Sequence, residues 1–287
     1  MAKRQTVEIG PHTVGDGHPV CIVAELGVNH LGDFECAKEM VHAAHDAGAD
    51  LLKFQTYTAE ERYDIENNPK GAQFVKWLKE WEFSREEETK LWEYAKSLGA
   101  TVFTSAFDPD SVDFAETMGT AAYKIAAFEL VNLELVRAIA QKHRPVIFTR
   151  GMANDSEVKR AIDVFERHNV PYIILHTISS YPTQKKDSHL RMIHTLRNRY
   201  NCPVGHSDHT VGTDIPPLAV AAGVNMIEKH FTVTPKRRES DNCFSLTPED
   251  LREMVWKVRQ AEDYMGSGEI VRIEAEEYMW SFRRYSN

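Results

Sequence analysis

Residues able to bind anions, cations or protons recur where short apolar, β-branched runs of the chain end. They close eight such runs: Glu25; Lys53 and Gln55; Ser105; Lys124; Thr149 and Arg150; His176; Ser207, Asp208 and His209; and Glu228, Lys229 and His230. Ammonium, hydroxyl and imidazole groups gathered in one place could hold an anionic substrate and a metal ion together. They predict a metal-assisted reaction of a substrate that carries a phosphate or carboxylate group.

Two lysines, Lys53 and Lys124, lie on either side of the run that ends at Ser105. A lysine inside a folded core is costly unless an anion pairs with it. One interpretation is a binding site for phosphate or carboxylate that contains both lysines and Ser105. The other is a pair of internal salt bridges, Lys53 with Glu25 and Lys124 with Glu129. Both interpretations stay open at this level.

The histidines at the ends of the last two runs, His209 and His230, are the residues that we expect to bind a metal. Adjacent strands lie about 4.8 Å apart, so two imidazoles can reach one cation and leave positions open for substrate. A shell of nitrogen, water and substrate oxygen suits Mn²⁺, Mg²⁺ or Zn²⁺. Alternation along the last run places Glu228 and His230 on the inner face and Lys229 on the outer face.

The elements that must position these residues alternate between strands and helices. Strands are predicted over Cys21–Ala24, Asp50–Gln55, Thr101–Ser105, Ala122–Ala126, Pro145–Thr149, Tyr172–His176, Pro203–Ser207 and Met226–His230. Helices are predicted over Asp33–Ala47, Ser84–Leu98, Asp110–Met118, Asn132–Lys142, Asp155–Arg167, His189–Tyr200, Pro216–Ala222 and Thr247–Met265. Eight such units over residues 21–287 predict a single α/β domain, a (β/α)8 TIM barrel.

A small β-hairpin is expected before the barrel, within residues 1–20. The segment Val7–Val20 contains Gly15–Asp16–Gly17, which we interpret as the hairpin turn. The competing architecture, a doubly wound open sheet, is disfavoured because the sequence contains neither GxGxxG nor GxxxxGK[ST]. In a barrel the active site lies at the carboxyl ends of the strands, which is where the polar residues gather.

The composition of the 287 residues is that of a globular protein, with 42% hydrophobic and 27% charged residues. The formal net charge of −9 predicts no nucleic-acid surface. No apolar run approaches the roughly 20 residues that span a bilayer, so no membrane contact is expected, and Thr6–His18 is too polar for a signal peptide. Four scattered cysteines form no CxxC pair, so we expect a reducing compartment and a cytoplasmic protein.

Seven stretches resemble, in order along the chain, the sialic acid synthases, a family that includes the N-acetylneuraminate, legionaminate and pseudaminate synthases. They are AELGVNHLGD (24–33), GADLLKFQT (48–56), FTSAFD (103–108), YKIAAFEL (123–130), GHSDHT (205–210), IEKHFT (227–232) and DNCFSLTPEDL (241–251). The resemblance implies a TIM barrel that condenses phosphoenolpyruvate with an open-chain N-acylated hexosamine, such as N-acetylmannosamine or a 2,4-diacetamido hexose. The implied products are a nine-carbon 2-keto acid and phosphate.

The family motifs also imply roles for individual residues. SDHT and EKHFT are metal-binding motifs and fall on His209 and His230, with Mn²⁺ the expected cation. By the same resemblance, Lys53, Ser105, Lys124 and Ser207 would hold phosphoenolpyruvate, Glu25 would position or deprotonate the attacking water, and Glu129, Tyr181 and Asp241 would contact the sugar. Gln55 is expected among the substrate-binding residues.

The chain departs from the family pattern in three places. Ala127 stands where the family has a phosphate-contacting serine, and the family's STGM reads Thr149–Arg150–Gly151–Met152. We expect Thr149 to replace the serine of that motif, and we hypothesise that Arg150 compensates for Ala127. Most members continue into a C-terminal antifreeze-like domain that supplies an arginine to the partner subunit's sugar site. We expect no such domain here, whether it is naturally absent, removed or supplied by another chain. A homodimer is possible, but a dimer that exchanges this domain is not assumed.

Three other functions compete with this one. A synthase could use a different aldehyde, such as a phosphorylated or smaller sugar, which Ala127 and Arg150 would allow. A Schiff-base aldolase would use one inward lysine and no metal, and the pair of His209 and His230 argues against it. A catalytically silent barrel would have no need for the full set of acidic, basic and imidazole groups at the strand ends.

Overall fold

Eight parallel strands close into a barrel in the computed structural model, which describes residues 5–63, 65, 69–237 and 239–284. The strands are β3 (Cys21–Glu25), β4 (Leu51–Thr56), β5 (Thr101–Ala106), β6 (Tyr123–Ile125), β7 (Val146–Thr149), β8 (Tyr172–His176), β9 (Val204–Asp208) and β10 (Met226–His230). Their order around the barrel follows the sequence, and β10 pairs with β3 to close it. The predicted (β/α)8 barrel is confirmed, and the carboxyl ends of all eight strands meet at one mouth.

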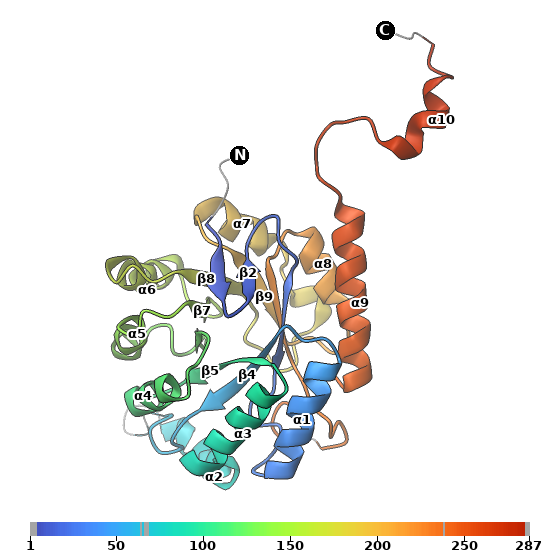
Figure 1. Cartoon of the computed structure of the whole chain (residues 1–287). Helices are drawn as coiled ribbons and strands as arrows, with labels where there is room; N and C mark the ends of the chain where they lie inside the picture. Colours follow the sequence, from blue (N-terminus) through green and yellow to red (C-terminus); the bar gives the residue numbers. More distant parts are fainter. Residues whose placement is uncertain (1–4, 64, 66–68, 238, 285–287) are drawn as a thin grey trace.

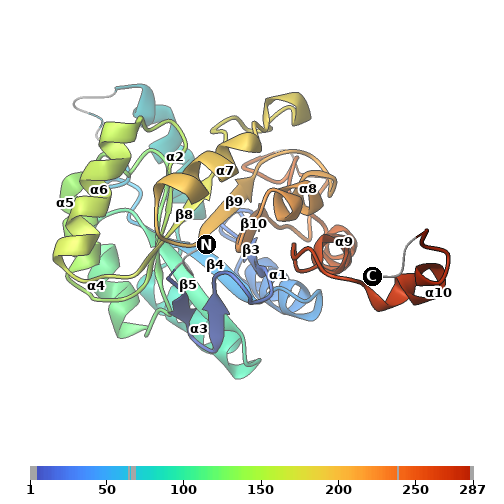
Figure 2. The same ribbon diagram turned by 90° about the horizontal axis from the view of Figure 1, so that it is seen from above.

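Helices surround the barrel (Figures 1 and 2). They are α1 (Phe34–Asp46), α3 (Arg85–Ser97), α4 (Pro109–Thr117), α5 (Leu133–Ala140), α6 (Asp155–Arg167), α7 (Arg191–Arg199), α8 (Ile215–Ala221) and α9 (Pro248–Met265). Capping boxes begin α3 at Ser84, α6 at Asn154 and α9 at Thr247, which explains why these starts were predictable. The structure adds elements that the sequence did not predict: α2 (Ala72–Trp81), α10 (Glu277–Trp280), and the 3₁₀ turns η1 (Pro69–Gly71), η2 (Lys185–Asp187) and η3 (Glu274–Glu276).

The expected N-terminal hairpin is present, but its turn lies elsewhere. Strands β1 (Val7–Ile9) and β2 (His12–Val14) pair antiparallel through the turn at Gly10–Pro11. Gly10 has a φ of 56°, a conformation that suits glycine, and proline follows without needing a ladder hydrogen bond. Gly15–Asp16–Gly17 does form a turn, in which the N–H of His18 donates to the carbonyl of Gly15 at 3.2 Å, but it leads from β2 toward β3, so its assignment as the hairpin turn is wrong.

The hairpin closes one end of the barrel. Its buried side chains Val7, Ile9 and Val14 pack in one cluster with inward-facing barrel residues such as Phe103 and Met226. Leu52 and Phe54 on β4 point the other way, into the larger apolar layer between the strands and the helices. The interior is thus apolar at the hairpin end, so polar side chains of the strands remain available at the opposite mouth.

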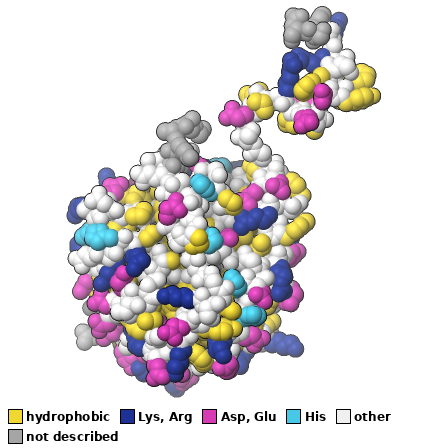
Figure 3. Space-filling model, in the orientation of Figure 1, with side chains coloured by type: hydrophobic (Ala, Val, Ile, Leu, Met, Phe, Trp, Pro, Cys, Tyr) yellow, Lys and Arg dark blue, Asp and Glu magenta, His cyan; other side chains and the backbone are white. Residues whose placement is uncertain are grey.

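The segment after α9 departs from the barrel as an arm (Figure 1). Residues 266–284 leave at the end where the hairpin lies, away from the mouth formed by the strand ends. Apolar side chains are exposed along it, among them Ile270, Tyr278 and Phe282. Figure 3 shows hydrophobic atoms, in yellow, on this part of the molecule, which stands apart from the barrel surface. Among the described residues, no helix combines the length and apolar character needed to cross a membrane.

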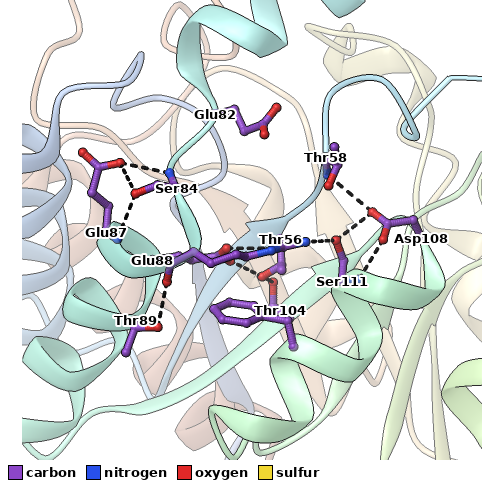
Figure 4. Close-up of polar contacts among 12 residues, drawn as sticks. Thr56, Thr58, Glu82, Ser84, Glu87, Glu88, Thr89, Thr104, Asp108 and Ser111 are labelled. Carbon is purple, nitrogen blue, oxygen red and sulfur yellow. Dashed lines mark hydrogen bonds and ion pairs between the residues drawn. The ribbon is translucent and has the colours of Figure 1, made fainter.

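A buried polar network ties β4 and β5 to α3 and α4 (Figure 4). The hydroxyl of Thr56 donates to the carboxyl of Glu88 and lies 2.9 Å from the hydroxyl of Thr104. Arg85 donates to Glu88 at 3.1 Å and to the hydroxyl of Ser111 at 2.8 Å. Burial raises the pKa of Glu88 to about 7, although its bonds to Thr56 and Arg85 oppose that shift.

This raised pKa predicts how stability depends on pH. Folded Glu88 keeps a proton that the unfolded chain releases near its ordinary pKa of 4.5, so its contribution to stability is lost as pH rises from about 4.5 to about 7. Relative to Glu88→Gln, the wild-type free energy of unfolding should fall over that window by up to about 3 kcal/mol. Denaturant titrations of both proteins between pH 4.5 and 8 measure this difference. A difference that stays flat would contradict the shift.

Candidate active site

Four ionisable side chains from four strands form a buried cluster at the mouth. Lys53 on β4 lies 3.1 Å from Oε2 of Glu25 on β3 and 3.2 Å from Oε2 of Glu228 on β10. Lys124 on β6 lies 3.5 Å from Oε1 of Glu228, which also accepts a hydrogen bond of 3.0 Å from the hydroxyl of Ser207. All four are less than 5% exposed. Two buried ammonium groups are therefore held by two carboxylates.

The salt-bridge interpretation is right for Lys53 and wrong for the second pair. Lys53 contacts Glu25 as expected, whereas Lys124 contacts Glu228 instead of Glu129. The carboxyl of Glu129 accepts a hydrogen bond from Asn132 at 3.0 Å. Glu228 is favoured because β10 aims it into the barrel, whereas Glu129 follows β6 in a turn.

Burial and pairing push the pKa values of this cluster apart. Burial raises the pKa of Glu25, and the ammonium group of Lys53 only partly opposes it. For Glu228, burial is outweighed by Lys124 and Lys53, which hold its pKa at about 2. Burial lowers the pKa of Lys124 to about 8 despite its carboxylate neighbour, while carboxylates raise that of Lys53 against burial. The cluster therefore contains one carboxyl group with a raised pKa and one ammonium group with a lowered pKa, which is the kind of environment that suits proton transfer.

The two predicted metal ligands face each other at the same mouth. The rings of His209 and His230 lie 5.4 Å apart, centre to centre. Nδ1 of His209 is 3.1 Å from the carbonyl of Ile178, which leaves Nε2 free for another partner. Nδ1 of His230 lies 3.5 Å from Asp241 and is buried without a hydrogen bond to any described residue. The ring of Tyr181 covers His209 at 4.2 Å.

Both histidines are held neutral, the form that binds cations. Burial lowers the pKa of His209 to about 4 and that of His230 well below its ordinary value. Within the part of the chain that the structure describes, no group of three or more His, Cys, Asp or Glu is arranged to hold a metal. Any cation here would therefore take the rest of its ligands from water and substrate.

A pocket of about 460 Å³ opens at the strand ends and brings most of the predicted residues together. Those lining it are Glu25, Lys53, Gln55, Ser105, Lys124, Thr149, Tyr181, Ser207, His209, His230 and Asp241. The hydroxyl of Thr149 has no hydrogen-bond partner among the described residues, and burial raises the pKa of Asp241 to about 6. Chemically, the pocket can bind an anion, bind a cation and move protons in one place.

Two predicted residues lie outside this lining, Glu129 and Arg150. The guanidinium of Arg150 donates to the carbonyls of Gly151 and Ala153 in its own loop. Ala127 itself lines the pocket, with Gly151 packed closely against it. The structure therefore does not bring Arg150 to the place that the hypothesis of compensation requires.

Outward-facing polar residues of the strand ends have other partners. Lys229 is turned away from the pocket, as alternation predicted, and lies 2.7 Å from Asp208. His176 stacks on His206 at 5.3 Å, and its Nε2 is 2.8 Å from the carbonyl of Ser188. These four residues face the helices, so they support the barrel wall and do not reach the mouth.

Sequence reasoning missed part of the lining. Glu228 was placed on the inner face but given no role. Two inward-facing lysines need a carboxylate partner, and alternation placed Glu228 on the same face, so its pairing with them could have been predicted. Arg62 and the aromatic residues Tyr63, Phe74 and Phe107 were not singled out at all, and Phe128 was given no contact with the pocket. Several of them lie in or near the unpredicted segment around α2, where no periodic pattern marked them.

Comparison with known proteins places this site in a family. The model of the NeuB family matches residues 40–270. An N,N'-diacetyllegionaminic acid synthase of Legionella pneumophila is 38% identical over 266 residues, covering 86% of this chain and 74% of that protein. A pseudaminic acid synthase of Campylobacter jejuni is 36% identical over 263 residues, covering 88% of this chain and 76% of that protein.

A solved structure agrees across nearly the whole chain. The N-acetylneuraminic acid synthetase of Leptospira borgpetersenii, crystallised in complex with citrate, superposes with a TM-score of 0.91 at 34% identity. The superposition covers 98% of this chain and 97% of that one. Motifs, pocket and comparisons agree, and the chain belongs to the NeuB family.

Proposed function

We propose that this chain condenses phosphoenolpyruvate with an open-chain N-acylated hexosamine, N-acetylmannosamine or a 2,4-diacetamido hexose, to give a nonulosonic acid and phosphate. Membership of the family makes it a sialic acid synthase-like transferase that forms a C–C bond. The observation that carries the proposal is the pocket, in which two buried ammonium groups and two neutral imidazoles face one cavity. A cytosolic location and a homodimer remain expectations from the sequence.

Two residues fit a divalent cation, for which we propose Mn²⁺. Nδ1 of His230 is a buried donor atom without a hydrogen bond to the described residues, and His209 keeps Nε2 available. When bound, such a cation supplies polarisation of a carbonyl oxygen. The neutral state of both imidazoles, maintained by burial, keeps their lone pairs ready at neutral pH.

The lysines and hydroxyl groups suit the anion. Phosphoenolpyruvate carries about three negative charges, which ammonium groups in a water-poor site stabilise strongly. Lys124 has the longest ion pair of the cluster, 3.5 Å to Glu228, so a phosphate can bind it with little loss. Ser105 and Thr149 add hydroxyl donors from β5 and β7, the two strands that flank β6 and its Lys124.

The remaining groups handle water and protons. In the proposed reaction C3 of phosphoenolpyruvate bonds to the aldehyde carbon, water adds to C2, and the bond from C2 to the phosphate oxygen breaks. Glu25, whose pKa burial raises, accepts the proton of the attacking water. The aldehyde oxygen takes up that proton, and the proton left on the C2 hydroxyl departs with the phosphate as the C2 ketone forms, so the transfers balance. Gln55 donates to Glu25 at 2.6 Å and fixes its orientation.

The test is phosphate release from phosphoenolpyruvate with Mn²⁺ across a panel of aldehydes, each with and without EDTA. The panel contains N-acetylmannosamine, a 2,4-diacetamido hexose, and pentose and hexose phosphates. Release with one acylated sugar that EDTA abolishes is the expected result. Release only with a non-acylated sugar would favour a synthase that uses a different acceptor. The lowered pKa of Lys124 makes it a candidate for Schiff-base formation, so borohydride trapping is included. Substrate trapped on Lys124 would contradict the proposal and indicate a Schiff-base aldolase.

A further inference from the structure

Arg62 places a guanidinium in the pocket without a carboxylate beside it. Its Nη1 donates to Oε1 of Gln55 at 2.9 Å, and its central carbon lies 3.9 Å from the centre of the Phe107 ring. Its Nε is buried and has no hydrogen-bond partner within the described part of the chain. No ion pair joins Arg62 to a described acidic residue, whereas Lys53 and Lys124 are both paired. A charged donor whose Nε is buried without a partner would be stabilised by a ligand that accepts a hydrogen bond from it.

The segment that leads to Arg62 is anchored by two hydrogen bonds to other parts of the chain. The backbone of Thr58 donates to Asp108 at 3.4 Å, and that of Ala59 donates to Glu82 at 2.9 Å. Asp108 is fixed in turn by two hydrogen bonds of 2.7 Å from Ser111, as Figure 4 shows. The backbone N–H of Arg62 itself donates to the carbonyl of Thr58 at 3.1 Å. The guanidinium is therefore presented by an ordered turn and oriented by its stacking on Phe107.

A carboxylate shares the pocket with Arg62 but does not touch it. Asp241 lines the same cavity, and the charges of the two groups act on each other although no ion pair joins them. A ligand lying between them would accept a hydrogen bond from Arg62 and donate one to Asp241. A secondary amide has both groups, a carbonyl and an N–H, on adjacent atoms.

We propose that Arg62 is a specificity-determining residue that binds the acyl carbonyl of the acceptor sugar, an assignment that rests on the proposed function. Asp241 lines the same cavity, where its carboxyl group can accept a hydrogen bond from the N–H of the same acylamino group. The stacked rings of Phe107 and Phe128, 6.0 Å apart, offer an apolar surface beside the guanidinium for the acyl methyl group.

The test uses Arg62→Met and Arg62→Lys with the acylated sugar that supports turnover in the phosphate-release assay. Losing a hydrogen bond from a charged donor predicts a rise of about 10- to 100-fold in the KM for that sugar in Arg62→Met, with the KM for phosphoenolpyruvate unchanged. Arg62→Lys should recover part of the loss. For mannose, which has a hydroxyl in place of the acylamino group, kcat/KM should change little.

Controls separate this inference from the function on which it rests. Arg199→Met removes a surface arginine paired with Asp155 and should leave all constants unchanged. Equal losses for the acylated sugar and for mannose would overturn the inference, since they indicate a role only through Gln55. A loss confined to hexose phosphates would also overturn it. Failure of wild-type protein to use any acceptor would instead count against the proposed function.

Discussion

Replacing Lys53 by methionine is expected to lower the free energy of unfolding by about 3–5 kcal/mol and to abolish turnover. Lys53 is 4% exposed and lies between Glu25 and Glu228, so methionine would leave two carboxylates facing each other in a low-dielectric interior. The cost arises from the charges left behind, since methionine fills nearly the same volume. Urea titration measures the stability, and calorimetry with phosphoenolpyruvate measures the lost anion binding.

A surface ion pair supplies the matched control. Lys90 lies 2.6 Å from Glu86, with both side chains more than half exposed. Lys90→Met should change the free energy of unfolding by less than about 1 kcal/mol, because water screens exposed pairs. Equal effects of the two substitutions would mean that the Lys53 cluster is not desolvated. Partial recovery in the double variant Lys53→Met/Glu25→Gln would show that the cost comes from the unpaired carboxylate, because Glu25 pairs with Lys53 whereas Glu228 keeps Lys124.

The second large effect is expected at the histidines of the mouth. His209→Ala and His230→Ala should each lower kcat by at least about 10²–10³-fold, because each removes a nitrogen proposed to hold the divalent cation. The fold should survive, since both rings line the pocket at the strand ends. Steady-state kinetics give the loss of rate, and calorimetric titration with Mn²⁺ gives the loss of metal affinity.

A histidine elsewhere tests whether the effect is local. His42 on α1 lies 3.2 Å from Asp46, and its side chain is half exposed. His42→Ala should keep wild-type kcat and Mn²⁺ affinity. Undiminished turnover or Mn²⁺ binding in either pocket variant would contradict the metal assignment. Loss of both together with a lowered thermal midpoint would instead identify a structural role for that imidazole.

The barrel and most of its mouth were predictable because two local rules operate together. Alternation along a strand fixes which face a residue occupies, so Lys53 and Gln55 could be placed inward and Lys229 outward from sequence alone. The position of the mouth at the strand ends then gathers residues that lie far apart in the sequence. Nine predicted residues reach the pocket for this reason, and Tyr181 and Asp241, which lie in loops, were expected from the family resemblance alone.

The sequence could not predict which side chains pair with one another when the pairing depends on how the barrel closes and where the loops run. Lys124 meets Glu228 across the barrel, a pairing that depends on the geometry of the whole ring of strands. Arg62 enters the pocket from a loop whose path is fixed by Asp108 and Glu82, neither of which marks it in the sequence. Arg150 was assigned to substrate by its place in a motif, but neighbouring carbonyls hold its guanidinium in its own loop.

The closure of the barrel by its last strand also affects how the chain folds while the ribosome is making it. A chain made from its N-terminus presents Lys53 and Lys124 long before β10 brings Glu228, the carboxylate that both lysines share. Until then, at most one of the two ammonium groups has its carboxylate partner, which disfavours compaction of a partial barrel. The strand that closes the barrel therefore also supplies the last carboxylate of the buried cluster. A ribosome that stalls before residue 226 leaves a chain without a closed barrel and without that carboxylate.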